Sequence, residues 1–100
     1  MLHTINKSPF EKNSLDSCLR LATAGGAVLL IEDAVYAAVK GTAVTERITE
    51  RMGELSFYVL GPDFAARGLS GASLIDGMEI VDYGGFVDLV AEHDATQAWL

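Results

Sequence analysis

AVLLIE, residues 27–32, is the stretch that decides the fold, because it is a short apolar run bounded by turn residues. Gly25 and Gly26 precede the run, and the acidic pair Glu32 and Asp33 closes it. A strand that helices cover on both faces has a continuous apolar sequence, whereas a half-exposed strand alternates apolar and polar residues. The stretch therefore predicts a central strand of a sheet that is covered on both sides.

Strands and helices are expected to alternate outward from this central strand. The pattern predicts further strands at residues 1–6, 55–60 and 78–82, and the tail, 97–100, could add a short fifth strand. Capping residues, proline and glycine predict helices between the strands. The first helix is capped by Asn13 or Ser14 and runs to about residue 24, the second covers 34–40, the third begins at Thr42 or Thr45 and ends near 52, and the last two cover 63–67 and 86–93. This alternation is typical of a parallel sheet with helices on both faces and right-handed crossovers. We expect one domain over residues 1–100.

The composition is more apolar than a small domain needs. Half of the residues are hydrophobic, and the mean hydropathy is +0.28. A chain of this size buries only about two thirds of the surface that its unfolded form exposes. The surplus indicates an apolar surface that a partner covers. The alternative is that the surplus lies on the two faces of a buried sheet.

Charge and cysteine content exclude several classes of protein. The net charge is −7, with seven basic residues scattered among fourteen acidic ones. Direct binding of a nucleic acid or an anionic membrane needs clustered Lys and Arg, which are missing. One cysteine allows no internal disulfide, MLHTINKSPF is unlike a signal peptide, and the longest apolar run, Ala27–Ile31, is far shorter than the roughly 20 residues that span a bilayer. We expect a cytoplasmic protein.

The carboxyl ends of the strands, where parallel sheets bind ligands, carry carboxylates but no phosphate loop. Asp33, Asp63 and Asp82 lie there, each at or near the start of a helix, and a carboxylate at that position usually caps the helix. We therefore expect helix caps at these aspartates instead of a Mg²⁺ site. His3 is expected to be a hydrogen-bonded core residue, and His93 to lie against a helix C-terminus. Neither histidine has a second ligand at metal spacing, so we predict no metal and no cofactor.

Cys18 is the one residue left with nucleophilic chemistry. At about 100° per residue, Cys18 shares the apolar arc of its helix with Leu15, Leu19, Leu21 and Ala22. Arg20 points nearly the opposite way and cannot activate the thiol, and the helix start is too far away to lower the thiol pKa much. The residues alone therefore favour a buried, inert thiol.

Several blocks of the sequence together resemble the DsrH/TusB family. They are MLHTINKSPF at the start, then LLIEDAVYAAV, FYVLGPDFAARGL and IVDYGGFVDL, and QAWL at the end. The resemblance covers essentially the whole chain in register. It implies a three-layer α/β/α domain with a parallel five-stranded sheet.

The resemblance also implies a function in sulfur transfer. Proteins of this kind form a heterohexamer, two copies of each of three chains, with homologous DsrE/TusD-type and DsrF/TusC-type partners. The assembly receives sulfur as a cysteine persulfide and passes it to a DsrC/TusE-type carrier. The Dsr branch serves oxidation of stored sulfur, and the Tus branch serves 2-thiolation of the tRNA wobble uridine. The principal persulfide cysteine belongs to the DsrE/TusD-type partner, so this chain is at most a secondary sulfurtransferase site.

The resemblance implies that Cys18 favours one branch, because DsrH-type members can carry a cysteine in the first helix and TusB-type members can lack one, and the KSPF and AWL blocks favour the same branch. We therefore predict a subunit closer to DsrH, in a sulfur-oxidation relay, with Cys18 as a candidate secondary persulfide site. The alternatives are a TusB-type subunit for tRNA thiolation, a purely structural subunit in which Cys18 carries no sulfur, and an unrelated flavodoxin-like binding module. Trp99 and Leu100 are candidate interface residues that either fold onto their own domain or meet a neighbouring subunit.

Overall fold

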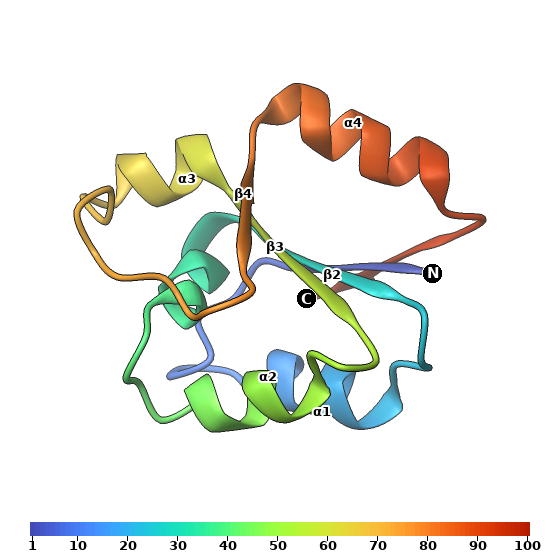
Figure 1. Ribbon diagram of the computed structural model, residues 1–100, viewed down its shortest axis with the longest axis horizontal. Coiled ribbons are helices and arrows are strands. Elements are labelled where there is room, and N and C mark those ends of the chain that lie inside the picture. The colour runs from blue at the N-terminus through green and yellow to red at the C-terminus, as the bar shows by residue number, and fades with distance from the viewer.

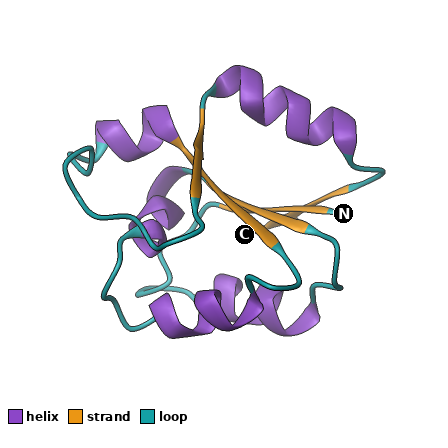
Figure 2. Ribbon diagram, in the orientation of Figure 1, coloured by secondary structure: helices purple, strands orange, loops and turns teal.

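A computed structural model describes residues 1–100 and contains five strands and five helices (Figures 1 and 2). The strands are β1 (Leu2–Ile5), β2 (Ala27–Leu30), β3 (Ser56–Leu60), β4 (Glu79–Val81) and β5 (Thr96–Trp99). The helices are α1 (Ser14–Leu21), the 3-10 helix η1 (Glu32–Ala38), α2 (Thr45–Arg51), α3 (Gly61–Ala66) and α4 (Tyr83–Glu92). All the predicted strands and helices are therefore present, including the short strand at the C-terminus.

All neighbouring strands of the sheet are parallel, in the order β4-β3-β2-β1-β5. In the register of the sheet, Ala27 of β2 lies between Leu2 of β1 and Ser56 of β3. Figure 1 shows α1 and α2 on one side of the sheet and α3 and α4 on the other. The three-layer α/β/α fold with five parallel strands is thus confirmed.

The stretch that decided the fold is the centre of the core, because every residue of β2 is buried. Val28 and Leu30 belong to a cluster of 19 buried residues beneath the sheet, together with residues of α1, η1 and α2. Ala27 and Leu29 belong to a cluster of only four buried residues on the α4 side. One face of the sheet is therefore much more thickly packed than the other.

Three helices, η1, α3 and α4, begin two or three residues before their predicted starts, and α1 ends at Leu21 instead of near residue 24. The helix after β2 is a 3-10 helix that begins at Glu32, whose φ of 49° lies in the left-handed region. The backbone N–H of Glu32 donates to Asp63 Oδ2 over 2.7 Å, and this bond holds the turn that starts the helix. Helix α4 begins at Tyr83, three residues before the predicted start, because Gly84 and Gly85 lie inside the helix although the sequence pattern reads them as a break.

Gly85 is needed in α4 because the helix approaches β4 closely at this point. A Cβ atom at Gly85 would lie 2.9 Å from the Cβ of Val81, which is too close for two carbon atoms.

No helix of the structure is both long enough and apolar enough to cross a membrane.

Candidate functional site

Cys18 lies on α1 and belongs to the cluster of 19 buried residues beneath the sheet. Its exposed fraction is 0%, and it shares the buried side of α1 with Leu15 and Leu19, whereas Arg20 is exposed. The predicted apolar arc of this helix is therefore confirmed at Leu15, Cys18, Leu19 and Ala22, but it is wrong at Leu21, which is 70% exposed. A thiol in this position packs as a small hydrophobic group.

Burial also keeps the Cys18 thiol protonated. It raises the pKa of Cys18 from an ordinary value of 9.0 to about 12, and the positive charge of Arg51 offsets only part of that rise. A thiolate, and not a thiol, is the species that attacks sulfur. In this conformation Cys18 therefore has neither the access nor the ionisation that sulfur transfer needs.

Arg51 has a structural role that the sequence did not reveal. From the last turn of α2, its guanidinium donates hydrogen bonds to the backbone carbonyl oxygens of Leu19 and Ala22, the latter over 2.8 Å. These carbonyls are at the C-terminal end of α1, where helix carbonyls lack partners within the helix and a cation is favourable. A cation is equally favourable at the C-terminal end of α2 itself, so no pattern in the sequence assigns Arg51 to α1.

The three aspartates at the carboxyl ends of the strands have different roles. Asp82 caps α4, accepting a hydrogen bond of 2.7 Å from the backbone N–H of Gly85. The predicted caps at Asp33 and Asp63 are wrong. Asp33 instead pairs with Arg67 over 2.9 Å, and Asp63 accepts the hydrogen bond from the N–H of Glu32. No three His, Cys, Asp or Glu side chains of the chain form a group that could hold a metal ion.

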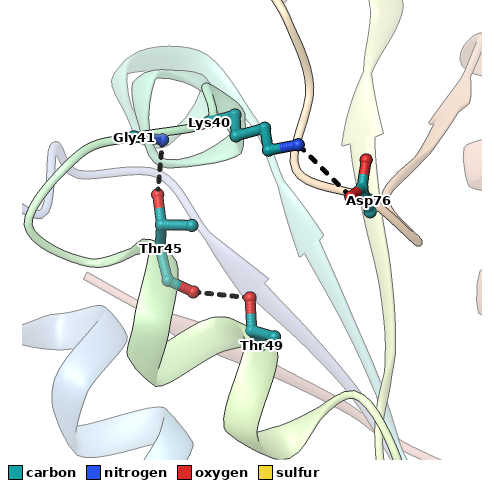
Figure 3. A network of polar contacts seen from close by, with 5 residues as sticks. All are labelled: Lys40, Gly41, Thr45, Thr49 and Asp76. Carbon is teal, nitrogen blue, oxygen red and sulfur yellow. Dashed lines mark hydrogen bonds and ion pairs between the residues drawn. The ribbon is translucent and has the colours of Figure 1, made fainter.

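A polar network fixes the start of α2 (Figure 3). Thr45 Oγ1 accepts a hydrogen bond of 3.1 Å from the Gly41 N–H, and the carbonyl oxygen of Thr45 accepts one of 2.9 Å from Thr49 Oγ1. Lys40, next to Gly41, pairs with Asp76 across 3.3 Å (Figure 3). Of the two predicted starts of this helix, Thr45 is thus the correct one. The network joins loops and holds no group that is buried and reactive.

The C-terminal strand is tied to the first strand by two aromatic rings. The indole Nε1–H of Trp99 donates a hydrogen bond of 3.0 Å to Nδ1 of the buried His3. Burial, followed by the charge of the N-terminal amino group, lowers the pKa of His3. The prediction of a hydrogen-bonded core histidine is confirmed, and His93 lies at the end of α4, with Nδ1 2.8 Å from the Leu89 carbonyl oxygen, as predicted.

The candidate interface residues, Trp99 and Leu100, differ in how far their side chains are exposed. Trp99 is half-buried and packs against the core of its own chain. Leu100 is 81% exposed, and only its carbonyl oxygen is held, by a hydrogen bond of 3.2 Å from Ser14 Oγ. Of the two, only the Leu100 side chain is largely free to meet a neighbour.

Comparison with known proteins places the whole chain in one family. The family model described as DsrH like protein matches residues 7–96. Proteins named TusB from Shigella flexneri, Pectobacterium parmentieri and Escherichia coli strain K12 are 39%, 36% and 36% identical, over 99% of this chain and 100% of each relative.

Two solved structures share the fold at low sequence identity. The crystal structure of the ychN protein from E. coli has a TM-score of 0.81 at 20% identity, with 97% of each chain covered. The structure of MTH1491, a protein of unknown function from Methanobacterium thermoautotrophicum, has a TM-score of 0.73 at 17% identity, covering 97% of this chain and 96% of that one.

The predicted placement closer to DsrH than to TusB stays a prediction, since the family model carries one name and the relatives carry the other. The family itself is not in doubt, because both kinds of match span nearly the full length of the sequence. The chain belongs to the DsrH/TusB family.

Proposed function

We propose that this chain is a TusB-type subunit of a sulfur-relay assembly that serves 2-thiolation of the tRNA wobble uridine. The observation that carries the proposal is the 36–39% identity to proteins named TusB over 99% of the chain. Sulfur oxidation, the branch that the cysteine in α1 favoured, has less support, because it rested on a thiol that proves to be buried.

Within the assembly we assign this chain a structural role. In persulfide transfer, a cysteine thiolate attacks the outer sulfur of a donor persulfide, the S–S bond breaks, and the donor leaves as a thiolate. Cys18 meets neither requirement of the attacking group, since its exposed fraction is 0% and its pKa is raised to about 12. The sulfur would then travel on the cysteine of a DsrE/TusD-type partner.

The distribution of apolar side chains supports association with other subunits. The large hydrophobic residues that remain exposed include Ile80, Tyr83, Val87 and Leu100, which all lie within the last 21 residues of the chain. Exposed apolar surface of this kind is typical of subunits that bury it in an assembly. We place the chain with DsrE/TusD-type and DsrF/TusC-type subunits, two copies of each, handing sulfur to a DsrC/TusE-type carrier in the cytoplasm.

Deletion of the gene in its host tests the proposal. We expect the fraction of wobble uridine carrying a 2-thio group, measured by mass spectrometry of digested tRNA, to fall sharply and to recover with the wild-type gene. A Cys18→Ala gene should restore it equally well. Unchanged thiolation after deletion would refute the function, whereas failure of Cys18→Ala in an intact assembly would restore the carrier role of Cys18.

A further inference from the structure

Helix α4 is apolar on two sides, although its packing on the sheet uses only one. Leu89 faces the sheet and is buried against Leu2 and Leu29. A second apolar flank, which we term the α4 patch, consists of Tyr83, Phe86, Val87, Val90 and Ala91; Phe86 lies at its edge and packs partly against the cluster that contains Leu89. Val87, near its centre, is 67% exposed.

The spacing of these residues makes the α4 patch a continuous stripe. Positions 83, 87 and 90, with 86 and 91 beside them, recur at intervals of three and four residues, which places them along one side of an α-helix. Asp88 and Glu92 fall on the opposite flank by the same rule. A solvent-facing flank of a surface helix is normally polar, so this stripe is unexplained by the fold of the chain alone.

The segment of the chain that carries the α4 patch is acidic in composition, although one of its carboxylates, Asp76, pairs with Lys40 from the preceding part of the chain. Residues 68–100 contain no Lys or Arg, and all seven basic residues lie earlier in the sequence. The acidic residues of this segment are Asp76, Glu79, Asp82, Asp88, Glu92 and Asp94. Six of the seven net negative charges of the chain therefore belong to the segment that carries the patch.

This charge distribution determines which partner fits. A second copy of the chain would bring two acidic segments together, and like charges at an interface oppose association. An anionic membrane is disfavoured for the same reason. A surface with an apolar centre and a rim of Lys and Arg would bury the stripe and neutralise the carboxylates.

We propose that the α4 patch is a docking surface for a different protein chain, whose contact surface is apolar at its centre and basic at its rim. The inference rests on the composition and exposure of α4 and its surroundings, and it holds whichever pathway the chain serves. It assigns to this helix a role in recognition in addition to its role in covering the sheet.

Binding of two designed peptides to the full-length chain tests the chemistry of the patch. Both peptides form amphipathic helices with the same leucine face, and they differ in carrying either lysines or glutamates beside it. By fluorescence anisotropy we expect the lysine peptide to bind at least tenfold more tightly than the glutamate peptide, and its affinity to fall with added salt.

Matched variants separate the patch from general charge attraction. Val87→Ser should weaken the lysine peptide at least fivefold, whereas Leu21→Ser should not, because Leu21 is equally exposed at 70% but lies alone on α1. Asp88→Asn should weaken binding more than Glu50→Asn, which removes a charge from α2. Both positions 87 and 21 are on the surface, so thermal melting should show unchanged folding.

Several results would overturn the inference. Equal binding of the two peptides, or equal effects of Val87→Ser and Leu21→Ser, would mean that the patch selects no basic partner. Self-association in sedimentation experiments that Val87→Ser abolishes would make a second copy the occupant. Binding of neutral phosphatidylcholine vesicles through Val87 would make it a lipid surface. The tRNA thiolation assay judges the proposed function separately.

Discussion

Cys18 is packed on every side by apolar residues of the larger core cluster, and this packing governs its chemistry. A reactive cysteine needs access to its substrate and a lowered pKa, and burial works against both. The residue type alone could not distinguish a packed thiol from a persulfide carrier, since the two differ in exposure and pKa and not in chemical identity.

Thiol labelling tests the packed state of Cys18. Ellman's reagent at pH 8 should leave the native chain unmodified and should label it fully in 6 M guanidinium, because the thiol is 0% exposed and its pKa is raised to about 12. Labelling of the native chain at the rate of a free thiol would contradict the packing role.

The raised pKa also predicts how the stability conferred by Cys18 depends on pH. The folded state holds the thiol proton more tightly than the unfolded state, whose thiol has a pKa near 9.0. The contribution of Cys18 is therefore complete below about pH 9 and is lost as the pH rises towards 12. Urea unfolding should show Cys18→Ala about 1 kcal/mol less stable than wild type at pH 7, and this difference should shrink at pH 10.

His3 should make the folded state sensitive to acid. Its pKa is lowered by burial below the ordinary value of 6.5, so the unfolded state takes up the proton more readily than the folded state. The stability that depends on neutral His3 is present above about pH 6.5 and is lost as the pH falls through the lower folded pKa. Urea unfolding at pH 7.5 and pH 5 should show a loss in the wild type that His3→Asn lacks.

Trp99 is coupled to this effect, because its indole N–H donates to the unprotonated Nδ1 of His3. His93→Asn is the matched control, since His93 lies at the end of α4, where its Nδ1 contacts the Leu89 carbonyl oxygen and not the His3–Trp99 pair. If His3→Asn retained the full acid sensitivity of the wild type, the neutral core histidine would be the wrong explanation.

At the scale of elements, Arg51 joins the two helices beneath the sheet. Arg51→Met should lower the free energy of unfolding by about 1–3 kcal/mol, because two carbonyls at the end of α1 lose a charged donor. Arg47→Met, on the same helix, should cost less than about 1 kcal/mol, since it removes only a half-exposed ion pair with Asp16. Equal costs in chemical denaturation would show that Arg51 does not hold α1.

The elements that could be predicted from sequence are those whose signal is local. The apolar run of β2 and the glycines after many of the helices are signals that can be read from neighbouring residues. The elements predicted from these signals are present in the structure. The 3-10 form of η1 could not be predicted, because the bond that fixes its first residue comes from Asp63, 31 positions away. The start of α4 was missed because Gly85 looks like a helix breaker until its contact with Val81 is known.

The candidate site was less predictable than the fold. The apolar arc of α1 placed Cys18 correctly inside the chain, but the family resemblance drew attention to its sulfur. Whether a thiol is reactive depends on burial and on charges from other helices, such as Arg51, which no spacing in the sequence reveals. The exposed stripe on α4 was visible in the sequence as IVDYGGFVDL, yet only the structure shows which of its apolar residues the sheet leaves uncovered.

At the scale of the whole molecule, the two faces of the sheet are unequal. The side with α1 and α2 encloses the cluster of 19 residues, and the α4 side has a cluster of four and an exposed apolar flank. The apolar surplus in the composition is therefore only partly hidden within the chain. This inequality is what we expect of a subunit that completes its packing against other chains.

Native mass spectrometry of this chain co-expressed with its TusC- and TusD-type partners tests whether it is a subunit of such an assembly. We expect one species whose mass corresponds to two copies of each of the three chains. A chain of 10.7 kDa that stays a monomer, while the other two chains assemble without it, would contradict it.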